Sequence, residues 1–174
     1  VTGSHNPPNY NGLKMVLAGQ TLYGEMIQDL RRRIASVNLC EGNGHLRHAN
    51  VIEAWLQRIT SDVKVARPMK LVIDCGNGVA GGIAPALFRR MGCEVIELFC
   101  EVDGRFPNHH PDPSKPENLR DLQRVLRESD AELGLAFDGD GDRLGVVTKD
   151  GEIIFSDRLL MLFAADVLCR NPGA

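Results

Sequence analysis

Three aspartates at alternate positions form the most chemically distinctive stretch of the chain, Asp138-Gly-Asp-Gly-Asp-Arg143. Carboxylates about 4 Å apart repel by roughly 4 kcal/mol at an effective dielectric constant near 20, so this spacing favours a bound cation. The intervening glycines let the backbone bend tightly and approach a ligand. Hard oxygen ligands on a short loop suit Mg²⁺, which keeps positions open for phosphate oxygens. The stretch predicts a magnesium site made by Asp138, Asp140 and Asp142.

Two other interpretations of this stretch are an ordinary Asp-Gly turn and a calcium-binding EF-hand. An EF-hand needs glycine at loop position six and glutamate at position twelve, and those positions hold Arg143 and Lys149 here. The EF-hand is therefore excluded. Apolar runs over 133–137 and 144–148 flank the stretch, so we expect one buried strand to end in this loop and another to leave it.

Predicted strands and helices alternate along the chain around this loop. Apolar and amphipathic segments predict strands over 70–74, 94–98, 133–137, 144–148 and 153–155, and helices over 83–91, 118–128 and 157–170, the last with Ser156 as its N-cap. This order predicts an α/β fold with a mostly parallel mixed sheet and covering helices. Ligands of such sheets bind beyond the carboxyl ends of the strands, where the aspartate stretch lies.

The first fifty residues carry weaker patterns. They predict a strand over 13–17, a turn over 18–21, a helix over 22–34 and a linker over 36–50, and a second amphipathic helix follows over 51–59. Before them lies a turn-rich loop with Ser4 and His5, and its serine is a candidate nucleophile or phosphate carrier. The loop has no G-x-S-x-G elbow, so a simple turn is the alternative. A magnesium ion and Arg143 could neutralise a phosphoryl group on Ser4.

The glycine-rich segment 75–82 also admits two interpretations. It contains G-x-G-x-x-G between an expected strand and helix, with Glu97 about twenty residues further on, which is the pattern of a dinucleotide-binding turn. Tight structural turns share this composition, and the segment lacks the Gly-Lys-Ser/Thr ending of a P-loop. A neighbouring loop over 101–117 contains His109 and His110, which we expect to pack among its prolines rather than to bind a ligand.

Composition excludes several classes of protein. The net charge is −3 with interspersed signs, so we expect no nucleic-acid or membrane-surface binding. No apolar stretch is long enough to cross a bilayer. The five cysteines form no C-x-x-C pair and mostly adjoin apolar runs, which predicts reduced thiols in a cytoplasmic protein. Because the chain starts with Val1 in a polar loop, we expect it to be a piece of a larger protein.

Two motifs together resemble a known family. Thr2-Gly-Ser-His-Asn-Pro7 and Asp138-Gly-Asp-Gly-Asp-Arg143 are similar to the active-site segments of the α-D-phosphohexomutases, especially the bacterial members that act on both mannose and glucose phosphates. The resemblance extends through Asp74-Cys-Gly-Asn-Gly-Val-Ala80, the 103–111 loop and the last helix. It implies that the 75–82 segment is a structural turn, so the dinucleotide interpretation is set aside.

The resemblance also implies a mechanism. Ser4 would carry a phosphoryl group and bind Mg²⁺ together with the three aspartates. Arg143 would lie beside the phosphoserine, His5 near the transferred group, and Lys14 would act as general acid/base. Substrates would be mannose or glucose 1- and 6-phosphates, converted through a bisphosphorylated sugar.

The resemblance further implies a domain division. Residues 1–50 would end the first of four domains, 51–152 would form the second with the metal loop, and 153–174 would begin the third. We therefore expect a cytoplasmic monomer whose 174-residue segment has little activity by itself. Two alternatives remain: a non-catalytic α/β module that binds metal or phosphate, and an aspartyl-phosphate phosphatase with Asp138 as nucleophile.

Overall fold

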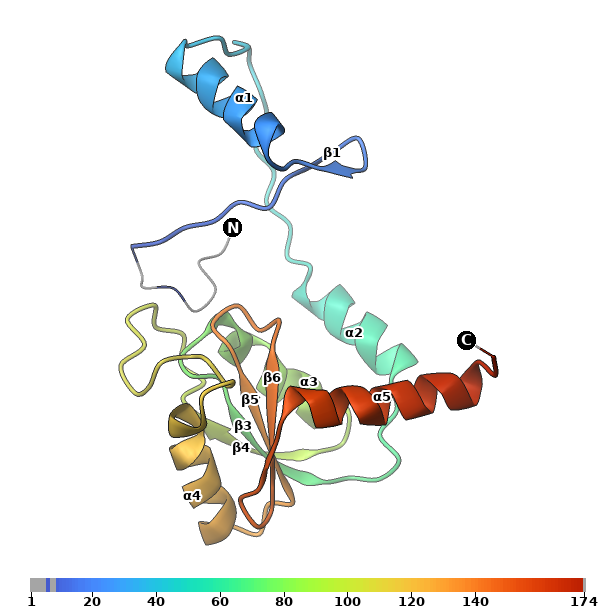
Figure 1. Cartoon of the computed structure of the whole chain (residues 1–174). Helices are drawn as coiled ribbons and strands as arrows, with labels where there is room; N and C mark the ends of the chain where they lie inside the picture. Colours follow the sequence, from blue (N-terminus) through green and yellow to red (C-terminus); the bar gives the residue numbers. More distant parts are fainter. Residues whose placement is uncertain (1–5, 7–8, 174) are drawn as a thin grey trace.

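A five-stranded sheet with helices on both faces forms the main body of the molecule (Figure 1). A computed structural model describes residues 6 and 9–173. Residues 9–51 contain a short hairpin and one helix, and none of them is buried. The elements in chain order are β1 (Val16–Leu17), β2 (Gln20–Thr21), α1 (Glu25–Ala35), α2 (Ile52–Asp62), β3 (Lys70–Asp74), η1 (Val79–Gly82), α3 (Ala84–Arg90), β4 (Glu94–Leu98), η2 (Pro116–Leu119), α4 (Arg120–Glu128), β5 (Leu133–Phe137), β6 (Leu144–Thr148), β7 (Ile153–Ile154) and α5 (Ser156–Arg170).

The strand order in the sheet is β4-β3-β5-β6-β7. β3 pairs in parallel with β4 and β5, while β6 pairs antiparallel with β5 and β7. β6 therefore runs against the other four strands, and the expected mixed, mostly parallel sheet is confirmed. Four strands have the predicted bounds, and the fifth is limited to Ile153–Ile154. Because β3 and β5 are parallel neighbours, the loops after Asp74 and after Phe137 emerge at the same edge.

Two apolar clusters form the core, one on each face of the sheet. Alternate residues of β3 divide between them: Leu71 and Ile73 face the cluster that includes α3, and Val72 faces the cluster under α4. In α4, Leu122 and Leu126 are four residues apart and fully buried, as expected for one face of a helix. Burying such a leucine contributes about 1.5–3 kcal/mol. The sheet therefore holds its loops on a rigid base.

Three sequence predictions were wrong. The predicted strand over 13–17 is limited to Val16–Leu17, and the predicted turn over 18–21 includes a second strand, Gln20–Thr21. Ala18 and Gly19 both have positive φ, so two residues are enough to reverse the chain. Ser156 is the first residue of α5 and not its N-cap, because the extended residue Phe155 takes that position without a side-chain hydrogen bond.

The remaining helices lie close to their predicted positions. Helix α1 begins after Gly24, which has a φ of 51°, and the 36–50 segment has no helix or strand, as predicted. Pro85 lies in the first turn of α3, where its missing N–H is tolerated. A turn of 3₁₀ helix precedes α4. In the described part of the chain, no helix combines the length and the apolar character that a membrane span requires.

Candidate functional site

The aspartate loop, residues 138–143, joins two antiparallel neighbours in the sheet. β5 ends at Phe137, and its partner in register is Leu144, the first residue of β6. The Gly141 amide donates a hydrogen bond of 3.1 Å to the carbonyl oxygen of Asp138, and the φ of Gly141 is 76°. This left-handed conformation is easily adopted by glycine and costly for other residues. The sequence therefore turns within six residues and directs its carboxylates to one side.

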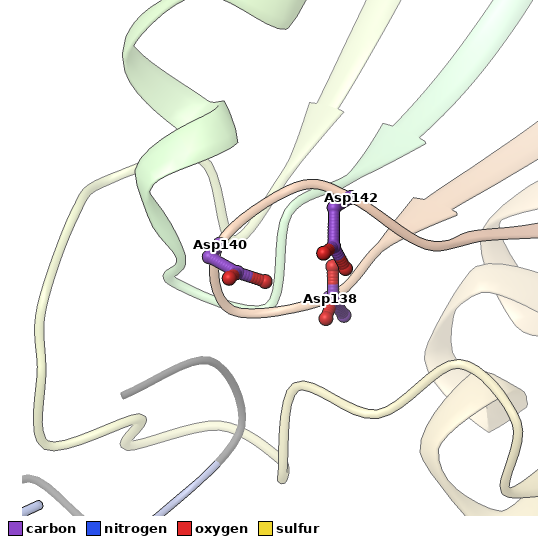
Figure 2. Close-up of side chains that lie close together, drawn as sticks. All are labelled: Asp138, Asp140 and Asp142. Carbon is purple, nitrogen blue, oxygen red and sulfur yellow. The ribbon is translucent and has the colours of Figure 1, made fainter. Parts of the chain in front are cut away.

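The carboxyl groups of Asp138, Asp140 and Asp142 converge in this loop. One oxygen from each residue lies within 4.8 Å of the others. Figure 2 shows the three side chains within the same turn, those of Asp138 and Asp142 close together. Oxygen ligands on opposite sides of a Mg²⁺ ion are about 4.2 Å apart, given bond lengths of about 2.1 Å. Small side-chain rotations would therefore allow all three to bind one divalent cation.

The side chain of Arg143 forms an ion pair with Asp138, the most deeply buried of the three aspartates. Its Nε lies 3.0 Å and its Nη2 2.9 Å from Oδ2 of Asp138, and its backbone amide donates to Oδ1 at 3.0 Å. Asp138 is fully buried. Because a buried charge is costly without a partner, these contacts give the buried carboxylate of Asp138 a hydrogen-bonding partner of opposite charge.

Asp112 approaches Arg143 from a different loop. Its Oδ1 lies 3.4 Å from Nη1 of Arg143 and also accepts hydrogen bonds from the amide and hydroxyl of Ser114. Asp112 is almost fully buried, with 8% of its surface exposed. The guanidinium of Arg143 thus lies between two carboxylates that fix its plane. Asp112 could not be predicted as a partner of Arg143, because the two residues are 31 positions apart in the chain.

Among the predicted catalytic residues, Lys14 is the one from the first fifty residues that the structure describes. Its Nζ lies 3.9 Å from Oδ2 of Asp142, and both side chains are exposed. The structure therefore brings Lys14 and Arg143 to the same loop as the three aspartates. Ser4 and His5 lie outside the described residues.

The glycine-rich segment 75–82 packs directly against the aspartate loop. The amide of Val79 donates a hydrogen bond of 3.1 Å to the carbonyl oxygen of Gly139. A Cβ atom at Gly78 would lie 2.8 Å from the same oxygen, so glycine is required for this approach. Since the amide of Val79 is already bonded to the protein, these contacts favour a tight structural turn over a phosphate-binding turn.

Asn77 connects the same segment to the chain beyond β4. It is buried with a φ of 62°, its amide donates to Phe99, and its side chain donates to Glu101 and accepts from Asn108. A positive φ is unusual for a residue with a side chain, but asparagine tolerates it better than most. These bonds hold the loop that follows β4 against the glycine-rich segment.

A buried ion pair that the sequence did not predict lies below this loop. Nε2 of His109 is 3.1 Å from Oδ2 of Asp74, and its Nδ1 is 2.9 Å from the carbonyl oxygen of His110. Burial of the ring by itself would lower the pKa of His109, but the hydrogen bond and charge of Asp74 raise it above its ordinary value of 6.5. With an acceptor at each ring nitrogen, the charged form suits this position best.

The ring of His109 was predicted to pack among the prolines of its loop, and the ring contact observed is with Phe99, which lies before that loop. The two rings meet edge to face, with centroids 5.4 Å apart. The sequence signal for the ion pair was the position of Asp74 at the carboxyl end of a buried strand, where polar groups of α/β sheets gather.

Comparisons with known proteins agree with this geometry. Residues 50–151 match the model of the family described as phosphoglucomutase/phosphomannomutase, alpha/beta/alpha domain II. All 174 residues are 60% identical to a phosphomannomutase/phosphoglucomutase of Pseudomonas aeruginosa, and the match with a phosphoglucomutase of Neisseria gonorrhoeae is 58% identical over 176 aligned positions. The chain covers 38% of the length of each relative.

A solved structure of the same family is also similar to this chain. A phosphoglucomutase/phosphomannomutase family protein from Burkholderia thailandensis superimposes with a TM-score of 0.93 at 59% sequence identity. The superposition covers 99% of this chain and 38% of the solved one. The similarity therefore includes the whole described structure but less than half of each relative.

Proposed function

Because this chain belongs to the phosphoglucomutase/phosphomannomutase family, we propose that the polypeptide containing it is a phosphohexomutase, which interconverts hexose 1-phosphates and hexose 6-phosphates. The proposed sugars are mannose and glucose, in line with the names of the relatives. One observation supports this most directly: three carboxylates, Arg143 and Lys14 meet at one edge of the sheet. Transfer of a phosphoryl group depends on such positioning and charge balance.

The proposed metal ligands are Asp138, Asp140, Asp142 and the phosphorylated Ser4. Their oxygen atoms suit Mg²⁺, which when bound neutralises charge on the phosphoryl group. Arg143 is anchored to Asp138 through Nε and Nη2, which fixes the plane of its guanidinium. We propose that Arg143 lies beside the phosphoserine, where a planar guanidinium suits contact with phosphoryl oxygens.

In the proposed reaction, phosphorylated Ser4 donates its phosphoryl group to the free hydroxyl of a hexose phosphate. The bond between Ser4 Oγ and phosphorus breaks while a bond from the sugar oxygen to phosphorus forms, and Lys14, as general acid/base, relays the proton of the sugar hydroxyl to Ser4 Oγ. The bisphosphorylated sugar then reverses its orientation and returns its other phosphoryl group to Ser4. In this second transfer, Lys14 relays the proton of the Ser4 hydroxyl to the sugar oxygen that is released. His5 lies beside the transferred group in this proposal.

The proposed domain division follows the same family. Residues 1–50 end a first domain, 51–152 form the second, and 153–174 begin the third of four. We propose a cytoplasmic monomer that binds neither nucleic acid nor membranes. Since the chain spans 38% of its relatives, we expect residues 1–174 alone to convert little or no mannose 1-phosphate to mannose 6-phosphate.

The test is phosphorylation mapping and kinetics of the natural polypeptide that contains this sequence. Intact mass and peptide mapping should place one phosphate on Ser4, and Ser4→Ala should abolish turnover. Ser61→Ala is the matched control, because Ser61 is an exposed serine on α2 and should leave turnover unchanged.

Two results would contradict the proposal. Phosphate trapped on Asp138 would favour an aspartyl-phosphate phosphatase. Full turnover in the Ser4→Ala protein would exclude a phosphoserine mechanism, and absence of both phosphate and turnover in the natural polypeptide would favour a non-catalytic binding module.

A further inference from the structure

Two free thiols face each other at the carboxyl ends of neighbouring parallel strands. Cys75 directly follows β3, and Cys100 lies two residues beyond β4. Their Sγ atoms are 3.4 Å apart. Cys75 is fully buried, while Cys100 is partly exposed. A buried thiol thus lies against the thiol of a partly exposed residue.

We propose that Cys75 and Cys100 form a reversible intramolecular disulfide when the protein meets a hydroperoxide or a small-molecule disulfide. The inference rests on the pair itself and is independent of the proposed mutase function. With hydrogen peroxide, the Cys100 thiolate attacks one peroxide oxygen, the O–O bond breaks, and Cys100 becomes a sulfenic acid. The Cys75 sulfur then displaces that oxygen as water. Two thiols lose two electrons in all, and the peroxide is reduced to two waters.

The order of these steps follows from the surroundings of each thiol. The hydrogen bond between the two sulfurs lowers the pKa of Cys100, although partial burial opposes this. The same bond and deeper burial raise the pKa of Cys75. Because the thiolate is the reactive form, Cys100 is the attacking residue and Cys75 the resolving one.

Backbone hydrogen bonds join the segment that contains Cys75 to the two residues directly before Cys100. The Cys75 amide donates to the carbonyl oxygen of Leu98 at 3.1 Å, and the Asn77 amide donates to that of Phe99 at 2.7 Å. A disulfide needs a sulfur separation of about 2.0 Å, so the sulfurs must approach by roughly 1.4 Å. Rotation of the side chains can supply much of that movement while these backbone bonds persist.

In the part of the chain that the structure describes, the other three cysteines make no sulfur–sulfur contact of this kind. Cys93 is buried, whereas Cys40 and Cys169 are exposed and lie on the linker and on α5. They therefore serve as internal standards for general oxidation. An exposed thiol that reacts first would indicate accessibility alone, whereas selective loss of the 75–100 pair would indicate a prearranged site.

The experiment oxidises the natural polypeptide under native conditions with hydrogen peroxide and, separately, with oxidised glutathione. Free thiols are then alkylated in denaturant, and peptides are mapped without reduction. We expect one cross-linked peptide pair containing Cys75 and Cys100, loss of two titratable thiols, and full recovery with dithiothreitol. Cys93→Ser should retain the cross-link, and Cys75→Ala should instead drive Cys100 to sulfinic acid, which dithiothreitol does not reverse.

Peptide mapping of the unmodified protein tests for the Cys75–Cys100 disulfide without any variant. The result therefore does not depend on whether a cysteine variant folds. The proposal is wrong if Cys75 stays alkylatable while Cys100 becomes a sulfinic acid or a mixed disulfide. It is equally wrong if Cys40 and Cys169 are consumed while both Cys75 and Cys100 remain reduced.

Discussion

Replacement of Gly78 by alanine tests how the glycine-rich segment supports the aspartate loop. The new Cβ would lie 2.8 Å from the carbonyl oxygen of Gly139, 3.0 Å from its Cα and 3.1 Å from the carbonyl oxygen of Asp138. All three atoms belong to the backbone, so no side chain can rotate out of the way. The φ of −78° and ψ of 174° at Gly78 suit alanine, so the cost arises from this contact and not from backbone strain.

The size of the effect follows from the overlap. Adding a methyl group to a packed site typically costs about 1–3 kcal/mol. If the aspartate loop moves to relieve the contact, its carboxylates leave the positions in which they converge. A loss of about 1–3 kcal/mol in ion binding corresponds to a dissociation constant for Mg²⁺ that is raised about 5-fold to 150-fold. We also expect the free energy of unfolding of Gly78→Ala to decrease by about 1–3 kcal/mol.

The assay is isothermal titration calorimetry with Mg²⁺ at constant ionic strength, combined with urea unfolding of the same samples. Gly82→Ala is the matched control, because it lies in the same glycine-rich segment and its Cβ would meet no atom within 4 Å. We expect Gly82→Ala to bind Mg²⁺ like the unmodified protein. Equal affinity in Gly78→Ala and the unmodified protein would refute the argument that this contact sets the loop position.

Two further predictions concern stability, both measured by urea unfolding. Because the pKa of His109 is raised, its pair with Asp74 should stabilise the fold fully below pH 6.5 and lose that contribution as the pH rises through the folded-state pKa. His109→Gln should remove that pH dependence, and an unchanged profile would contradict the ion pair. Leu126→Ala should lower the free energy of unfolding by about 2–5 kcal/mol, since Leu126 is fully buried. Leu160→Ala, at a leucine that is 67% exposed, should change it by less than about 0.5 kcal/mol, and similar losses in both would contradict the assigned core.

The strands of the sheet could be predicted from the sequence because each is a short apolar run with clear ends. β3, β4 and β5 occupy the predicted residues, and β5, for example, lies between the polar residues Glu132 and Asp138. The hairpin at Val16–Thr21 was harder, because strands of two residues leave no periodic pattern. The start of α5 differed because Ser156 has the composition of an N-cap, whereas the backbone places Phe155 there.

Convergence of the three aspartates was predictable, because they are close in sequence and a tight turn brings neighbours together. The contacts that hold this loop and its surroundings in place could not be predicted from the sequence. Asp74 meets His109 across 35 positions, and Arg143 meets Asp112 across 31. Each depends on the 99–115 loop folding back over the ends of β3 and β5, and residue types alone do not specify that path.

These long-range contacts decide how well the aspartate loop can function. Its own six residues contain the carboxylates, but Gly78 and Val79 limit where Gly139 can lie, and Asp112 helps to orient Arg143. Metal affinity depends on holding ligands in place before the ion arrives, since like charges otherwise drive them apart. The same aspartate sequence in a peptide would have the carboxylates without these constraints, so the motif predicts which atoms would bind an ion, and the surrounding sheet edge would determine how tightly.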